Sequence, residues 1–102
     1  MEFTIGRNAL ENTKLIQESE PLDVWFHIDG YPSAHLIMKN PEKLTLKQLR
    51  KEGIIYKMAL HLKKKNHKKA NNINIIYTYI RNVSCTTIPG LVNTTSLAYI
   101  TA

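Results

Sequence analysis

Two short stretches of alternating polarity, joined by a turn, constrain the fold of this chain more than any other feature. Residues 23–28 are rich in aromatic and β-branched side chains, as strands are. An Asp-Gly-Tyr-Pro turn signal follows at 29–32, and residues 34–38 have the pattern of a returning strand. The sequence therefore predicts a β-hairpin that is centred near Tyr31.

Burial predicts the register of this hairpin, because a slip of one residue would mix polar and apolar side chains on both of its faces. With the turn centred near Tyr31, the opposed pairs are Asp23–Lys39, Trp25–Ile37 and His27–His35. These six residues share one face, which is mixed in character. The other face is wholly apolar and is expected to form the core: Val24, Phe26, Ile28, Ala34, Leu36 and Met38.

The mixed face has two interpretations. As an open or half-covered surface, it would offer Trp25 for stacking on a nucleic-acid base, worth about 1–3 kcal/mol per base. His27 and His35, partly protonated near neutral pH, would then stack or donate to phosphate. Alternatively, the N-terminal segment folds over this face, buries Trp25 and gives both histidines structural hydrogen bonds. The sequence leaves both interpretations open.

The remaining pattern predicts a single α+β domain over residues 1–102. Asn8 with Glu11, and Thr45 with Gln48, have the spacing of helix capping boxes. We expect strands at 3–5, 73–80 and 96–101, a short helix at 9–16, a main helix at 46–64, a basic loop at 66–72 and a turn at 89–90. The sum is an antiparallel or mixed sheet that is packed by one main helix plus a short N-terminal helix. Gly53 lies inside the main helix, at a cost of about 1 kcal/mol relative to Ala, and is expected to permit close packing on the sheet.

Positive charge is concentrated in the middle of the chain. Residues 1–30 carry six acids and two bases, a balance of −4, whereas residues 31–102 carry twelve bases and two acids, a balance of +10. Eleven of those twelve bases lie between Lys39 and Lys69, and the densest run comprises Lys63, Lys64, Lys65, Lys68 and Lys69. Such a cluster attracts phosphate backbones, acidic lipid or acidic proteins. A compositional bias toward Lys, Asn and Ile, or the preference of helix ends for cations, explains the same residues without a ligand.

Gly6, Arg7 and Asn8 precede the first predicted helix and form a candidate anion site. Gly6 can adopt a positive φ, the helix start offers free N–H groups, and Arg7 can contact a phosphate in a bidentate manner. Glu11 competes for the same positive helix end. An ion pair of Arg7 with Glu11 or Asp23 is therefore an equal alternative.

Several function classes lack their usual sequence signals. No apolar run approaches the length of about 18 residues that spans a bilayer, so we expect no membrane association. Cys85 is the only cysteine, which fits a reducing compartment and predicts a cytoplasmic protein. Nucleophile elbows, glycine-rich phosphate loops and complete zinc sets are missing, so we expect no catalysis, no cofactor and no metal. A metal-dependent hydrolase built on His27 and His35 is the weakest alternative.

Several motifs resemble the signature of the NFACT-R domain, the RNA-binding domain of ribosome quality-control factors. The most specific is Asp-x-Trp-Phe-His at 23–27, followed by Ser-x-His at 33–35. Gly6-Arg7-Asn8-Ala9 with Asn12 is also similar, as are the segments 72–78 and 89–92. The Ser-Ala-His form and Asn71-Asn72 most resemble the stand-alone eukaryotic branch, whose members carry a C-terminal coiled coil.

The resemblance implies an α+β domain that binds RNA near ribosomes or tRNA. The contact residues that it implies are Arg7, Asn8, Asn12, Asp23, Trp25, His27, Ser33 and His35. To these, the hairpin face and the charge pattern add Lys39 and the five lysines of the basic run. Three features depart from the family: a very short strand before Gly6, the segment 82–85 in place of a basic pair, and no coiled coil within these 102 residues.

Two binding functions compete. The leading one is a non-catalytic binder of RNA, either tRNA or ribosomal RNA, in translation or ribosome quality control, with DNA as a second candidate ligand. The alternative is a protein-interaction module that docks on a ribosome-associated partner, the basic run meeting an acidic surface. The short first strand also predicts an exposed sheet edge through which copies of the chain would pair into a homo-oligomer.

Overall fold

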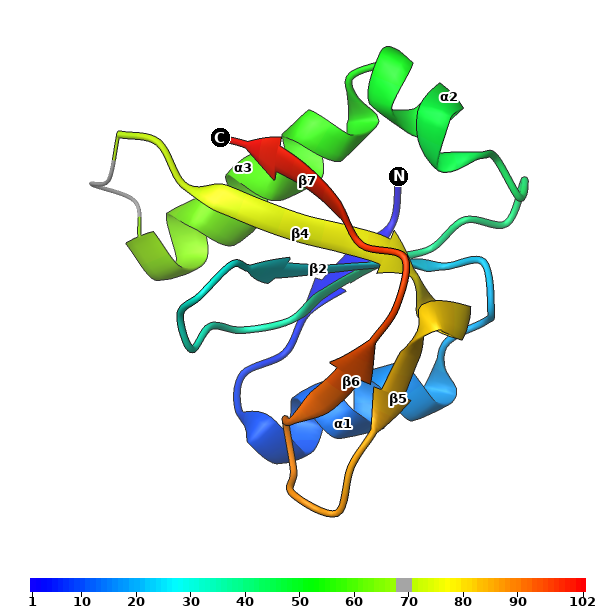
Figure 1. The fold of residues 1–102 in the computed structure, drawn as a ribbon. Helices are drawn as coiled ribbons and strands as arrows, with labels where there is room; N and C mark the ends of the chain where they lie inside the picture. Colours follow the sequence, from blue (N-terminus) through cyan, green and yellow to red (C-terminus); the bar gives the residue numbers. More distant parts are fainter. Residues whose placement is uncertain (68–70) are drawn as a thin grey trace.

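The computed structural model describes residues 1–67 and 71–102 and folds them around a five-stranded antiparallel sheet (Figure 1). In chain order the elements are β1 (Phe3–Ile5), α1 (Ala9–Glu18), β2 (Val24–Ile28), β3 (Leu36–Met38), α2 (Leu46–Lys51), α3 (Ile54–His67), β4 (Asn74–Tyr79), the 3₁₀ helix η1 (Ile80–Asn82), β5 (Val83–Cys85), β6 (Val92–Thr94) and β7 (Ala98–Thr101). The strand order is β1-β3-β2-β4-β7, and β5 and β6 form a separate two-stranded ribbon. The predicted α+β class is confirmed.

The hairpin has the predicted register. β2 and β3 pair antiparallel with Trp25 opposite Ile37, while β1 adds to β3 and β4 adds to β2. The hairpin therefore forms the centre of the sheet. Burial holds this register, because a shift by one residue would turn the fully buried Phe26 and Leu36 away from the core.

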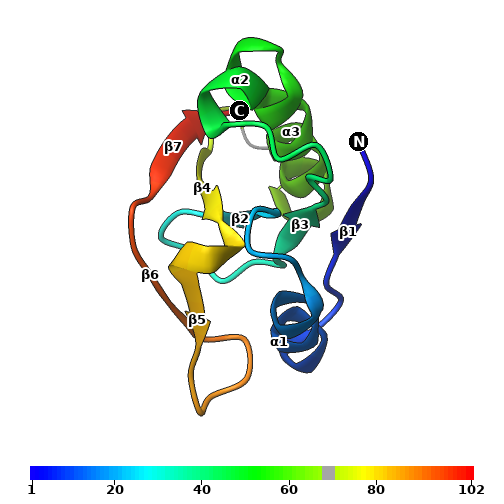
Figure 2. The same cartoon turned by 90° about the vertical axis from the view of Figure 1, so that its right-hand side faces the viewer.

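The apolar face of the hairpin packs against α2 and α3, which lie together on one side of the sheet (Figure 2). The core residues on α3 recur at spacings of three and four, so they form one stripe that faces the strands. The hairpin contributes Val24, Phe26, Ile28, Leu36 and Met38, and the helices contribute Leu49, Ile55, Met58, Ala59 and Leu62. The hairpin side of this core is the predicted one, except that Ala34 is only partly buried and packs against it.

The mixed face of the hairpin is covered as well. α1 and the β5–β6 ribbon lie on the other side of the sheet (Figure 2), where Trp25 and Ile37 pack in a second cluster with Ile16, Ile80 and Val83. Trp25 is only 1% exposed, so the interpretation of an open face is wrong. The alternative, in which the N-terminal segment folds over this face, is confirmed for Trp25 and His35, although the β5–β6 ribbon shares the cover. It is not confirmed for His27, which is half-buried and meets its neighbours through ring contacts.

The predicted main helix consists of two helices. α2 ends at Lys51 and α3 begins at Ile54, because Gly53 between them adopts φ of +76°. A glycine takes this left-handed conformation without steric cost and so ends a helix. One continuous helix over 46–64 is therefore wrong. The expected close packing at Gly53 is wrong too, since a Cβ built there meets no atom within 4 Å.

Two further differences concern the chain after α3 begins. α3 continues to His67, so the predicted loop does not start at 66, and Lys68 and Lys69 lie outside the described residues. After β4 the chain forms η1 and the β5–β6 ribbon, which were not expected. Each ribbon strand has three residues, too few for a period-two pattern to stand out. The predicted turn at 89–90 lies in the loop between them.

Replacing Gly53 by alanine tests the break between α2 and α3. In one continuous helix, Gly53→Ala would raise the free energy of unfolding by up to about 1 kcal/mol. At φ of +76° we expect a loss instead, of about 1–2 kcal/mol, because an L side chain is strained there. Urea unfolding followed by circular dichroism measures the change, and a gain in stability would contradict the break.

Candidate nucleic-acid interface

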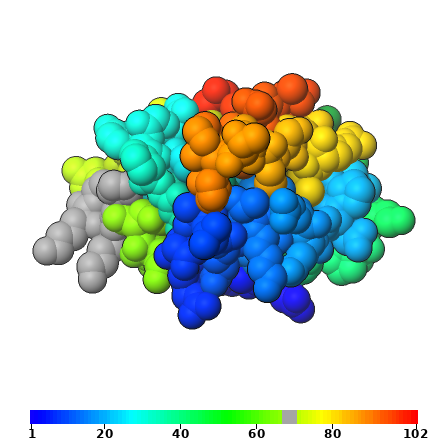
Figure 3. All heavy atoms as spheres, turned by 90° about the horizontal axis from the view of Figure 1, so that it is seen from below, coloured from blue at the N-terminus to red at the C-terminus, as the bar shows by residue number. Residues whose placement is uncertain are grey.

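A cleft of about 870 Å³ opens beside the covered face of the hairpin. Its lining comes from the start of α1, the hairpin and its turn, the end of α3, and the segment from Pro89 to Thr94. Figure 3 shows these parts of the chain meeting on one face of the molecule, with the blue start of the chain beside the cyan turn and the orange loop. The tertiary fold thus assembles the cleft from segments that are far apart in sequence.

Eight of the predicted contact residues line this cleft. They are Arg7, Asn8, Asn12, Trp25, His27, Ser33, His35 and Lys65. Asp23, Lys39, Lys63 and Lys64 are described by the structure but do not line it. The fold therefore brings most of the predicted contact residues together at the cleft and places these four outside it.

Three rings of the hairpin lie at the base of the cleft. Trp25 Nε1–H donates to Nδ1 of His35 over 3.0 Å. The His27 ring stacks on Trp25 with ring centroids 5.7 Å apart, and meets the His35 ring edge-on at 5.0 Å. Because an indole N–H can only donate, Nδ1 of His35 must carry a lone pair. His35 is thus a neutral ring with its proton on Nε2.

Burial keeps these histidines uncharged. The pKa of His35 is lowered from 6.5 to about 4, mainly by desolvation and also by His27, against an opposing effect of the Gly90 backbone. Burial also lowers the pKa of His27, against smaller opposing effects of the Ile28 backbone and Asp29. The base of the cleft is therefore uncharged at neutral pH. Since Trp25 and His35 are only 1% and 2% exposed, the ring that it presents is mainly that of the half-buried His27. Partial protonation of this pair, which the sequence suggested, is not what the structure shows.

Asn12 connects α1 to the hairpin. Its side chain is buried, and its Oδ1 accepts the backbone N–H of His35 over 3.3 Å. Gly6 allows this approach, since a Cβ at that position would overlap the Asn12 carboxamide oxygen. Gly6 N–H in turn donates to the carbonyl of His35 over 2.9 Å. Gly6 is required for close packing, and the positive φ expected for it is not observed.

Arg7 and Asn8 lie at the rim of the cleft, where α1 begins. Asn8 is the N-cap, and its Oδ1 accepts the N–H of Glu11 over 2.9 Å. The exposed guanidinium of Arg7 pairs with the Glu11 carboxylate at 2.9 Å. This contact lowers the pKa of Glu11. Of the alternatives for Arg7, the ion pair with Glu11 is the one formed, so a phosphate would compete with that carboxylate.

Some lining residues were missed by sequence reasoning. They lie in two loops, and they are Tyr31, Pro32, Pro89 and Leu91. Their only sequence signal was turn chemistry, which predicts a bend but not what the bend faces. Ser33 has a structural part in the first loop, because its Oγ accepts the N–H of Ile28 over 3.2 Å.

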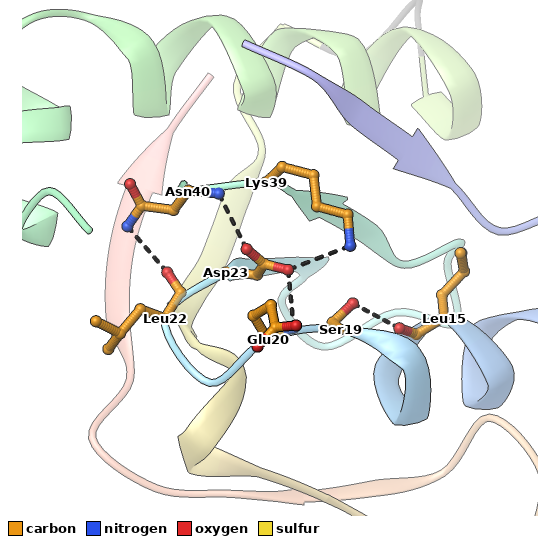
Figure 4. Close-up of polar contacts among 7 residues, drawn as sticks. All are labelled: Leu15, Ser19, Glu20, Leu22, Asp23, Lys39 and Asn40. Atoms are coloured by element: carbon orange, nitrogen blue, oxygen red, sulfur yellow. Dashed lines mark hydrogen bonds and ion pairs between the residues drawn. The ribbon is translucent and has the colours of Figure 1, made fainter. Parts of the chain in front are cut away.

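Asp23 and Lys39 lie at the other end of the paired strands, outside the cleft (Figure 4). The buried Asp23 carboxylate accepts the N–H of Glu20 at 2.9 Å and of Asn40 at 3.0 Å, and the Nζ of Lys39 at 3.3 Å. These contacts tie the loop before β2 to the loop after β3. Asp23 and Lys39 thus stabilise the hairpin, while their contact with nucleic acid remains a prediction.

The lysines at the end of α3 differ in their surroundings. Lys65 lines the cleft, next to Asn66. Lys64 is exposed, whereas Lys63 is half-buried and its Nζ donates to the carbonyl of Asn71 over 2.8 Å. The basic run therefore reaches the cleft through Lys65.

The described residues contain neither a metal-binding cluster nor a membrane-spanning helix. Within residues 1–67 and 71–102, no three His, Cys, Asp or Glu side chains gather in a way that could hold a metal ion. The Nδ1 lone pair of His35 already accepts the indole proton of Trp25. Over the same residues, no helix has the length and apolar character needed to cross a bilayer.

Known proteins resemble this chain in sequence and in fold. A family model described as "NFACT protein RNA binding domain" matches residues 3–95. Coiled-coil domain-containing protein 25 is 38% identical in Danio rerio and 33% identical in Mus musculus, each over 85 residues that cover 80% of this chain and 40% of the relative. The chain thus matches less than half the length of these relatives. The C-terminal part of the fibronectin/fibrinogen-binding protein from Streptococcus suis has the same fold, with a TM-score of 0.80 over 97% of this chain and 39% of that chain, at 16% identity.

The buried neutral His35 makes the stability of the fold depend on pH. Its pKa of about 4 in the folded state lies below the ordinary 6.5, so the unfolded chain binds the extra proton between these values. The contribution of neutral His35 to the free energy of unfolding should be fully present above pH 6.5. It should be lost as the pH falls toward 4, by on the order of 3 kcal/mol. His27 contributes in the same direction. Urea unfolding across this pH window measures the loss.

His35→Gln is the matched variant for this measurement. A glutamine oxygen can accept the indole N–H without titrating, so the variant should show a flatter profile between neutral pH and about pH 4. An unchanged profile would mean that another group causes the loss.

Proposed function

The chain belongs to the NFACT protein RNA-binding domain family, and we propose that it is a non-catalytic RNA-binding module that acts in translation or ribosome quality control. Membership of this family supports a nucleic-acid-binding role. We propose tRNA or ribosomal RNA as the ligand, with DNA as a weaker one. We also propose that residues 1–102 form one such domain, and that it works in the cytoplasm, where a lone Cys85 stays reduced.

The observation that carries this proposal is the position of the cleft at the end of a basic helix. Neither α2 nor α3 contains an acidic residue. Lys65 near the end of α3 lines the cleft, and Lys64 beside it is exposed. Phosphates that follow these lysines would bring the attached nucleotides to the cleft.

The chemistry of the cleft favours binding over catalysis. His35 is uncharged, with a pKa of about 4, and its Nδ1 is hydrogen-bonded to Trp25, so it is a poor general acid or base at neutral pH. Arg7 is paired with Glu11 rather than with a nucleophile. Aromatic rings, an amide and cations are the groups that contact RNA in other modules.

Docking of a protein is the second candidate function, because apolar side chains are exposed near the cleft. Leu10 on α1 and Ile88 in the β5–β6 loop are both exposed, and the two segments meet where Gly90 packs on Ala9. A ribosome-associated protein could cover this patch and meet the basic run with an acidic surface. Its capture after nuclease treatment would favour this function.

Pairing of two copies is a further proposal. β1 forms one edge of the sheet and has only three residues, so its outer side is a place where a second β1 could pair. Sedimentation analysis over a range of protein concentrations tests for a dimer.

Filter binding with tRNA, ribosomal RNA fragments and DNA tests the proposed function. We expect RNA affinity at low salt, and a plot of log affinity against log salt with a slope of about −0.7 for each phosphate contacted on a single strand. The physical reason is the release of counterions from the phosphates. If RNA does not bind even at low salt, the proposal is wrong.

Arg7 permits a test in which affinity increases. Glu11→Gln removes the carboxylate that pairs with Arg7, while its amide oxygen can still accept the Arg7 N–H. We expect RNA to bind about three- to tenfold more tightly at low salt, because the guanidinium becomes free for a phosphate. The same filter-binding assay measures the gain.

Glu18→Gln is the matched control for this variant. It makes the same charge change on the same helix, but its partner Lys14, unlike Arg7, does not line the cleft. Equal gains in both variants would reflect the overall charge alone and would exclude a contact between Arg7 and RNA.

A further inference from the structure

Two loops at the cleft expose aromatic and apolar surface. Tyr31, in the turn after β2, is 63% exposed, and Leu91, in the loop before β6, is 54% exposed. Pro32 and Pro89 line the cleft from the same two loops. Rings and apolar side chains of this kind pack against the flat face of a nucleobase regardless of its identity.

Hydrogen bonds hold both loops in place. In the first loop, the N–H of Ala34 donates to Oδ1 of Asn66 at the end of α3, over 3.2 Å. In the second loop, the N–H of Gly90 donates to Oγ1 of Thr13 on α1, over 2.8 Å. The surface that they present is therefore preorganised, and a ligand would lose little free energy in ordering it.

The base of the cleft offers a hydrogen-bond donor that the fold does not use. Asn12 is 6% exposed and its Oδ1 accepts from His35, but its Nδ2 donates to no group in the described part of the chain. No fully buried side-chain nitrogen or oxygen there lacks a partner, so this Nδ2 must reach the surface of the cleft that Asn12 lines. The edges of nucleobases carry carbonyl oxygens and ring nitrogens that accept such a donor.

Charge is separated between the base and the rim of the cleft. The base consists of Trp25 with the uncharged rings of His27 and His35, which suit a neutral ring better than a phosphate. The rim carries the exposed cations Lys65 and Arg7, and a phosphate at Arg7 would compete with its partner Glu11. A ligand that satisfies both parts has an uncharged planar ring joined to an anion.

We propose that this cleft holds one unpaired nucleotide, with its base against Tyr31, Leu91 and Asn12 and its phosphate at Arg7 and Lys65. This inference rests on the proposed RNA binding and specifies the RNA element: a single-stranded end or a loop. The volume of about 870 Å³ falls within the range of small-ligand sites, about 300–1,000 Å³. A duplex keeps both faces of its bases stacked, so it cannot present a base to the cleft without unpairing.

A comparison of single-stranded and duplex RNA separates this inference from simple charge attraction. The probes are a fluorescent ten-nucleotide single strand and the blunt duplex of the same sequence, measured by anisotropy at fixed salt. Charge alone favours the duplex, because its phosphate density is higher. We expect the single strand to bind about tenfold more tightly, and a version of this strand that lacks its bases to lose that advantage.

Two pairs of variants place the effect in the cleft. Tyr31→Ala and Leu91→Ala should each weaken single-strand binding by about five- to tenfold and leave duplex binding unchanged. Tyr99→Ala and Ile88→Ala are the matched controls, since these residues are 54% and 59% exposed and do not line the cleft. All four side chains are exposed, so thermal unfolding should confirm that each variant is folded.

The outcomes distinguish the two levels of the proposal. If RNA binds but the duplex binds as well as the single strand, or the two cleft variants behave like their controls, then the nucleotide site is wrong and RNA binding stands. If neither RNA form binds at low salt, the proposed function itself fails. Loss of single-strand binding in the cleft variants alone supports the site.

Discussion

The hydrogen bond from Trp25 to His35 is the contact on which the candidate site depends. It joins β2 to the residue that precedes β3, and both side chains are buried beneath α1 and the β5–β6 ribbon. The main chain of His35 is bonded to Gly6 on one side and to Asn12 on the other. The hairpin, the start of α1 and the base of the cleft are therefore one hydrogen-bonded unit, and a change in any of its members would move the others.

The sheet of this 102-residue chain packs against a hydrophobic core on each of its two faces. Small domains bury a modest share of their surface, so a hairpin that packs on both faces adds stability that a one-sided sheet would lack. Phe26 and Leu36 face α2 and α3, whereas Trp25 and Ile37 face α1 and the ribbon. The second core is what excludes water from His35 and keeps it neutral.

The residues of the family signature and the residues exposed to a ligand are largely different sets. Asp23 holds two loops together, Trp25 and His35 hold each other, and Asn12 links the helix to the hairpin. The side chains that are exposed at the cleft, such as Tyr31 and Leu91, lie in loops that this framework positions. A rigid hydrogen-bonded support that positions exposed loops is a common arrangement for binding sites.

By itself the sequence determined the hairpin, its register and the division of its faces, because strand side chains alternate and only one register buries Phe26 with Leu36. It also determined where α2 begins, since the capping box at Thr45 is local. The break at Gly53 and the cover over Trp25 were decided only by tertiary structure. Helical periodicity continues across the break, and no local sequence pattern predicts which element packs on a given face of a sheet. The cleft, too, was decided only by tertiary structure, because Asn12, Tyr31, Lys65 and Leu91 come together only when the whole chain is folded.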